Sequence, residues 1–122
     1  MFYPHRHLHA YVHNGRIGVL LEIGCESDFA PRTDTFQALA RDAALHIAAV
    51  APTNVETLLA QPFVKDPART VADVLNDAAA LLRERVAFTR FIRWSTEDEG
   101  PATDDEPPRS PAVILSFGRA RS

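Results

Sequence analysis

The amino-terminal part of the sequence alternates apolar and polar residues with the period of a β-strand. Residues 8–12 predict a short strand, and residues 16–24 predict a return strand whose odd positions form one apolar face, namely Ile17, Val19, Leu21 and Ile23. Between them, Asn14-Gly15 supplies the positive φ angles that a two-residue type I′ turn requires. The segment therefore predicts a β-hairpin.

Two later segments place apolar residues at helical spacing. Residues 33–50 carry one apolar stripe, made by Phe36, Leu39, Ala40, Ala43 and Ile47. Residues 70–85 repeat the same offsets with Val71, Val74, Leu75, Ala78 and Leu82. Thr33 and Thr70 are suitable N-caps, Asp73 lies where a capping box places its acidic residue, and Pro52 ends the first helix. We expect two helices that use these stripes to pack on one sheet.

The remaining segments complete the predicted order of elements. Residues 55–60 predict a short helical turn, residues 61–67 a loop, and residues 86–94 a strand. That last strand alternates regularly, with Val86, Phe88, Arg90, Ile92 and Trp94 opposite Ala87, Thr89, Phe91 and Arg93. The fold class is therefore α+β: a small antiparallel sheet in the order β-β-α-α-β, with the helices packed on one face. Its second face would expose apolar groups unless another copy covers it, which predicts a homodimer.

Composition divides the chain at about residue 96. Residues 1–96 are long enough for one domain with one core, and they balance ten acidic against ten basic side chains. Residues 97–122 carry six acidic side chains and three arginines, and their beginning is rich in proline, which predicts an acidic linker and tail. Within that tail, the apolar residues 112–117 either add a strand to a sheet edge or remain a loose end.

Charge and cysteine content exclude several classes of protein. The balanced core has no basic stripe for a phosphate backbone, so nucleic acid is not an expected direct partner. The sequence shows no membrane helix and no signal peptide. The single cysteine, Cys25, excludes an internal disulfide and fits a reducing cytoplasm, where we expect it to be a small buried residue at a strand end.

Motifs for covalent chemistry are also missing. The sequence has no P-loop, no G-x-G-x-x-G, no G-x-S-x-G, no H-E-x-x-H and no C-x-x-C, so we predict neither an enzyme nor a bound cofactor. Four histidines, His5, His7, His9 and His13, fall on one side of an extended strand. Such a row either shares a metal ion or forms a solvated or interface face, and the second interpretation is the one we adopt. His46 stands alone on the first helix, where we expect it at the helix surface or boundary.

A short segment between the hairpin and the first helix is the candidate contact site. It reads Cys25-Glu26-Ser27-Asp28-Phe29, followed by Ala30. Asp28 and Phe29 allow two interpretations. The acid favours the positive end of a short helix and the ring fills the core, or both side chains project into another protein.

Three ordered blocks of the sequence resemble the core domain of bacterial elongation factor Ts. They are residues 11–22 continuing through 25–29, residues 61–67 with Thr70-Val71, and residues 90–94, which read Arg-Phe-Ile-Arg-Trp. The resemblance spans about residues 8–94. It implies a nucleotide exchange factor that binds the GTPase elongation factor Tu and promotes the release of GDP.

The resemblance also implies roles for individual residues. The family's intruding Thr-Asp-Phe-Val segment matches Ser27, Asp28, Phe29 and Ala30. By that match the Phe29 ring would wedge beside the magnesium and phosphate region of the GTPase, while Asp28 helps to move a neighbouring helix. The sequence differs from the family in Pro31 after this segment, in its acidic tail, and in starting at the core without the small ubiquitin-associated-like domain. An alternative function is therefore a truncated, non-exchanging relative that serves as a dimerisation or protein-interaction module.

Overall fold

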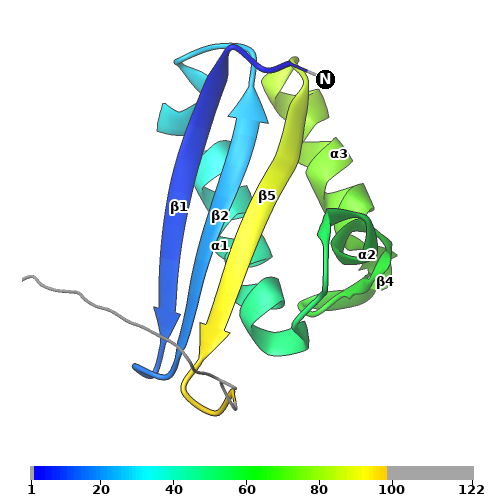
Figure 1. The fold of residues 1–122 in the computed structure, drawn as a ribbon. Coiled ribbons are helices and arrows are strands. Elements are labelled where there is room, and N and C mark those ends of the chain that lie inside the picture. The colour runs from blue at the N-terminus through cyan, green and yellow to red at the C-terminus, as the bar shows by residue number, and fades with distance from the viewer. Residues whose placement is uncertain (1, 99–122) are drawn as a thin grey trace, which may run out of the picture.

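The computed structural model describes residues 2–98 and contains a three-stranded sheet with helices on one side (Figure 1). Its elements are β1 (His5–His13), β2 (Ile17–Cys25), η1 (Ala30–Arg32), α1 (Asp34–Val50), α2 (Val55–Ala60), β3 (Pro62–Phe63), β4 (Asp66–Thr70), α3 (Val71–Leu82) and β5 (Val86–Ser95). The main sheet is antiparallel in the order β1-β2-β5. The predicted α+β class is confirmed, while residues 99–122, including 112–117, lie outside the described part.

The first hairpin turns at Asn14 and Gly15, whose φ angles are 54° and 67°. The Arg16 N–H donates to the His13 carbonyl at 3.0 Å, which closes the turn. The ladder pairs His13 with Ile17, so the connection holds three residues and the predicted two-residue loop is wrong by one. At the other end of the hairpin both strands extend beyond their predicted ends, to His5 and Cys25, which pair with each other.

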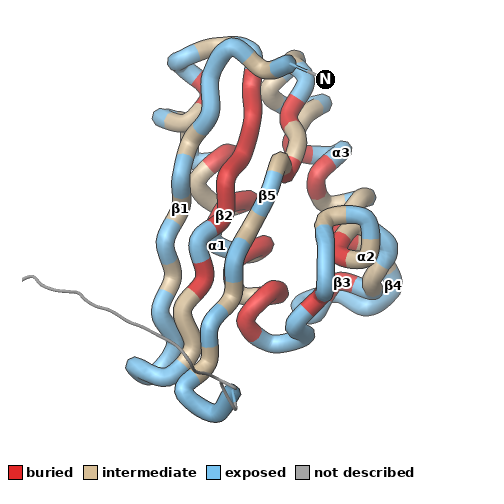
Figure 2. Tube along the Cα trace, viewed as in Figure 1, coloured by how far each residue is buried: buried red, intermediate tan, exposed pale blue. Residues whose placement is uncertain are grey.

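The core lies between the sheet and the helices. Both predicted helical stripes face inward, and α1 covers β1 and β2 while α3 covers β5. Figure 2 shows that β2 is buried along most of its length, between the mostly exposed β1 and the partly buried β5. The central position of β2 explains why its apolar odd positions dominate the core.

Both predicted caps are present. Thr33 Oγ1 accepts from the Phe36 N–H at 3.1 Å and begins α1. Thr70 and Asp73 form a complete capping box. The Asp73 N–H donates to Thr70 Oγ1 at 3.1 Å, and the Thr70 N–H donates to Asp73 Oδ2 at 3.0 Å. These bonds to Thr70 hold the pKa of Asp73 below its ordinary value.

The segment 61–67 corrects a prediction. It is not a plain loop, because β3 and β4 pair as a small second sheet. His46, expected at the helix surface, is fully buried beneath this hairpin. Its Nδ1 accepts from the Val64 N–H at 3.1 Å, its Nε2 hydrogen-bonds Gln61 Oε1 at 2.9 Å, and its ring stacks on Phe63. The hairpin therefore depends on a helix residue that supplies its polar partners.

Strand β5 corrects a second prediction, that of regular alternation. Ile23 pairs with Phe88 and Glu22 with Arg90, so Thr89 is an extra residue in a β-bulge. A bulge moves every later side chain to the opposite face. Phe88 and Phe91 consequently both pack on the helix side, while Arg90, Ile92 and Trp94 lie on the uncovered face.

Within residues 2–98, no helix is both long enough and apolar enough to span a bilayer.

Candidate protein-contact site

The candidate contact segment forms a sharp corner between β2 and α1. The Phe29 side chain is 67% exposed and Asp28 is also exposed, whereas Ala30 is buried. Ser27 Oγ accepts from the Ala30 N–H at 3.2 Å, and the Phe29 carbonyl accepts from the Arg32 N–H at 2.9 Å. Of the two interpretations left open by the sequence, the one in which Phe29 fills the core is wrong, because its ring faces solvent. The structure brings the four residues together at this corner.

Pro31 fits this corner without distortion. It lies within the first turn of η1, where a backbone N–H has no partner within the helix. Its carbonyl accepts from the Gln37 side chain at 2.6 Å, which ties the turn to α1. The difference from the family at this position is therefore compatible with an ordered turn.

Two glutamates hold the corner to the turn before β5: Glu26, which the sequence analysis placed in the segment without a role, and Glu84, which it did not select. Glu84 Oε1 accepts from the N–H groups of Glu26 and Ser27 at 2.8 and 3.0 Å, and Glu84 Oε2 accepts from Ser27 Oγ at 2.8 Å. In the opposite direction, Glu26 Oε2 accepts from the backbone N–H and from Nε of Arg85, at 2.7 and 2.9 Å. These bonds to Arg85 hold the pKa of Glu26 below its ordinary value. No local pattern indicates such contacts, because the partners lie 57 to 59 residues apart.

Cys25 is buried at the end of β2, as predicted. Its Sγ donates to the Ser27 carbonyl at 3.3 Å. Burial, and secondarily the nearby Glu84 carboxylate, raise the pKa of the Cys25 thiol. The thiol is therefore a structural residue of the corner rather than an activated nucleophile.

The uncovered face of the main sheet is the second candidate surface, and we call it the open face. Its exposed apolar side chains come from all three strands, and they are Leu8, Val12, Leu20, Ile92 and Trp94. A shallow apolar hollow of about 300 Å³ lies over this face at Gly18, which has no atom within 4 Å of the position of a Cβ. Large exposed apolar patches of this kind mark interaction surfaces.

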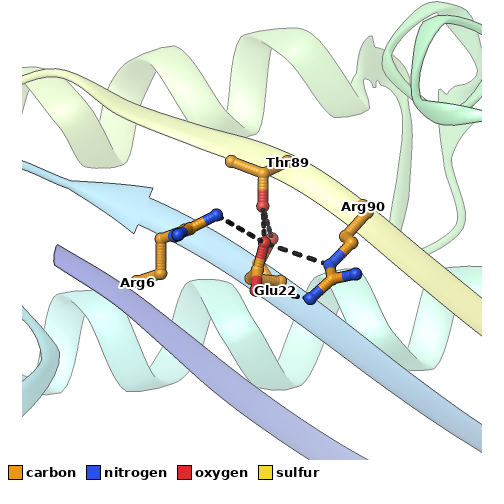
Figure 3. A network of polar contacts seen from close by, with 4 residues as sticks. All are labelled: Arg6, Glu22, Thr89 and Arg90. Atoms are coloured by element: carbon orange, nitrogen blue, oxygen red, sulfur yellow. Dashed lines mark hydrogen bonds and ion pairs between the residues drawn. The ribbon is translucent and has the colours of Figure 1, made fainter. Parts of the chain in front are cut away.

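One acidic side chain, Glu22, lies beside the apolar residues Leu8 and Leu20 on the open face. Figure 3 shows it among Arg6, Thr89 and Arg90. Glu22 is only 9% exposed and receives bonds from Thr89 Oγ1 at 2.7 Å and from Arg90 Nε and Nη2 at 3.3 and 3.2 Å. Arg6 on β1 lies 3.9 Å from the same carboxylate. The bonds from Thr89, and then those from Arg90, hold the pKa of Glu22 below its ordinary value. The bulge at Thr89 thus supplies a hydroxyl that donates to this carboxylate.

The histidines of β1 lie on its helix-facing side at the edge of the sheet. His7 meets the Phe36 ring edge-on at 5.4 Å between centroids. Burial, then the neighbouring charges of His7 and Arg41, lower the pKa of His9. Among residues 2–98, no group of three or more His, Cys, Asp or Glu side chains is arranged to hold a metal ion.

Fold and site together define a small α+β protein with two surfaces suited to protein contacts. Comparison with known proteins agrees with this class. The family model for elongation factor TS matches residues 3–57. The chain is 34% identical to elongation factor Ts of Rubrobacter xylanophilus, over 71% of this chain and 68% of that protein. It is 31% identical to elongation factor Ts of Coprothermobacter proteolyticus, over 72% of this chain and 68% of that protein.

Another relative, elongation factor Ts of Trichlorobacter lovleyi, is 40% identical over 69% of this chain, but the match spans only 27% of that longer protein. Taken together, these matches place the chain in the elongation factor Ts family. They support an elongation factor Ts-like role in translation.

Proposed function

We propose that this protein binds elongation factor Tu and promotes the release of GDP by inserting Asp28 and Phe29 into the GTPase. The observation that carries the proposal is the exposure of the Phe29 ring on a corner whose neighbours on both sides are hydrogen-bonded or buried. An apolar ring that an ordered loop presents to water is suited to a contact. The proposed activity needs no covalent step and no cofactor, and it takes place in the cytoplasm without direct contact to nucleic acid.

The energetic basis is linkage. A partner that binds the nucleotide-free GTPase more tightly than the GDP-bound form weakens GDP binding by the same factor. Complete burial of one aromatic ring contributes roughly 1.5–3 kcal/mol, and each ~1.4 kcal/mol of differential binding changes affinity tenfold. Since Phe29 is 67% exposed, burial of its remaining surface in the nucleotide-free complex alone changes GDP affinity by on the order of tenfold.

The test is the rate at which labelled GDP leaves elongation factor Tu of the same organism when unlabelled nucleotide is in excess. We expect this chain to accelerate release, and we expect the double variant Asp28→Ala, Phe29→Ala to lose most of the acceleration. Val50→Ala is a matched control, because Val50 is also an exposed apolar residue but lies at the other end of α1. Equal acceleration by the double variant and the original chain would refute the role of the corner.

We also propose that the open face joins two copies of this chain. Three strands spaced ~4.8 Å apart and nine or ten residues long outline an area of roughly 14 Å by 30 Å. This is on the order of half the ~800 Å² that each partner contributes to a standard interface. The expected homodimer is consequently at the weak end of specific interfaces.

Sedimentation equilibrium over a range of micromolar concentrations tests the dimer. Leu20→Glu places a charge on the central strand of the open face and should give a folded monomer. Leu81→Glu is the control, because Leu81 is 74% exposed on α3 and away from this face. A monomeric original chain, or an undiminished dimer in Leu20→Glu, would contradict the proposal.

The alternative function, a non-exchanging interaction module, is favoured by the same open face. The two functions differ in a single result. A chain that dimerises but neither binds elongation factor Tu nor accelerates GDP release is such a module, whereas acceleration that depends on Phe29 identifies an exchange factor.

A further inference from the structure

The corner is held by a carboxylate from a distant turn. Residues 83–85 connect α3 to β5, and Glu84 extends from this connection to the end of β2. Two consecutive backbone N–H groups, those of Glu26 and Ser27, point at one oxygen of Glu84, and the Ser27 hydroxyl donates to the other. Hydrogen bonds to an ionised acceptor are roughly twice as strong as neutral ones. Glu84 therefore fixes both the backbone and the side chain at the start of the corner.

The connection before β5 is shaped to deliver this carboxylate. Arg83 adopts the left-handed conformation, with φ of 61°, and its N–H donates to carbonyls of the last turn of α3. The Glu84 N–H then donates to the Ala79 carbonyl at 3.3 Å. The helix end thereby fixes the backbone from which the Glu84 side chain extends.

Ser27 passes this restraint to the exposed residues. Its hydroxyl donates to Glu84 and accepts from the Ala30 N–H. The bond to Ala30 spans Asp28 and Phe29, so the Ser27 side chain links the Glu84 anchor to the far side of the exposed pair. Ala30, on the far side of the corner, is buried. The direction in which Phe29 projects is thus fixed by two anchors, and one of the two depends on Glu84.

We propose that Glu84 is a positioning residue, which holds the 26–30 segment so that Phe29 and Asp28 are presented to a protein partner in a preformed geometry. The assignment deepens the proposed exchange function and rests on it for the identity of the partner. Preformed loops bind more tightly because less conformational entropy is lost on association. Glu84 itself need not touch the partner.

The first experiment requires no partner. Amide hydrogen exchange, followed by NMR on the full chain, should show the Glu26 and Ser27 amides exchanging at least about tenfold faster in Glu84→Ala, because their acceptor is removed. Glu84→Gln retains an oxygen acceptor and should show a smaller increase. Asp77→Ala is the control, because it removes an acid of α3 whose ion pair with Arg69 lies outside the corner. Unchanged protection of both amides in Glu84→Ala would overturn the positioning role.

The second experiment is a double-mutant cycle on affinity for nucleotide-free elongation factor Tu. Glu84→Ala should weaken binding about tenfold in the original chain, and less than twofold when Asp28 and Phe29 are already alanine. If Glu84→Ala does not fold, the same cycle is measured with Glu84→Gln. This variant should weaken binding to nucleotide-free elongation factor Tu about threefold, and the effect should disappear when Asp28 and Phe29 are already alanine. An equal loss in both backgrounds would show that Glu84 acts elsewhere, and would overturn the proposal.

The two experiments separate the possible failures. If the original chain does not bind elongation factor Tu, the proposed function fails, while the exchange rates of the Glu26 and Ser27 amides still decide whether Glu84 orders the corner. If binding is normal and the cycle shows no coupling, the proposed function stands and the positioning role fails.

Discussion

Replacement of His46 tests how the β3–β4 hairpin is attached to α1. The side chain is completely buried, and its two ring nitrogens bond to the backbone of Val64 and the side chain of Gln61. Removal of the ring in His46→Ala leaves the Val64 N–H without its acceptor, at a cost of about 1–3 kcal/mol. The lost packing and the remaining cavity add roughly 2 kcal/mol. We therefore expect a total loss of about 3–5 kcal/mol in the free energy of unfolding.

Two further variants separate these contributions. His46→Asn places an oxygen near the position of Nδ1 and should retain the bond from Val64, so its loss should be smaller than that of alanine. His46→Phe retains the ring stacked on Phe63 but removes both hydrogen bonds. Urea unfolding gives the free energy of unfolding of all three variants. In a thermal melt of a domain of this size, each 1 kcal/mol of lost stability lowers Tm by about 4–8 °C. A loss below about 1 kcal/mol in His46→Ala would refute the account of this network.

Other predictions concern pH and backbone geometry. The pKa of His9 is lowered in the folded state, so the unfolded chain binds the proton more readily below pH 6.5. The free energy of unfolding should therefore fall as the pH falls through that region. His9→Gln should flatten this part of a plot of unfolding free energy against pH. Ala51 ends α1 at a φ of 55°, so Ala51→Gly should raise Tm by relieving about 0.5–1 kcal/mol of strain. A Cβ at Gly24 would lie 2.7 Å from the Tyr3 ring, so Gly24→Ala should cost about 1–3 kcal/mol in denaturant unfolding. Gly18→Ala, with open space around it, should change stability by less than about 1 kcal/mol.

Sequence periodicity was sufficient for the parts of the fold in which local and long-range interactions agree. The stripes from Phe36 to Ile47 and from Val71 to Leu82 identified both long helices, and Thr33 and Thr70 marked their first turns. The hairpin was predicted because Asn14 and Gly15 tolerate positive φ. Each of these features is encoded within a few neighbouring residues.

The features that sequence missed depend on partners far along the chain. The bulge at Thr89 arises from pairing with β2, which lies more than 60 residues earlier, and it reverses the face of every later residue in β5. His46 is buried, and its polar partners come from the β3–β4 hairpin and the residue before it. The same holds for the site: the resemblance to the elongation factor Ts family singled out Asp28 and Phe29, but nothing in the sequence indicated Glu84, their anchor. A carboxylate on a turn is ordinary in sequence, and only the folded chain brings it to the corner.

The affinity of this chain for the two forms of elongation factor Tu tests the central claim most directly. Calorimetric titration into nucleotide-free and GDP-bound protein gives the ratio of the two dissociation constants. The account predicts binding to the nucleotide-free form at least about tenfold tighter, and a ratio that shrinks by about tenfold or more in Asp28→Ala, Phe29→Ala. Equal affinities for the two forms, or a ratio that the double variant leaves unchanged, would contradict it.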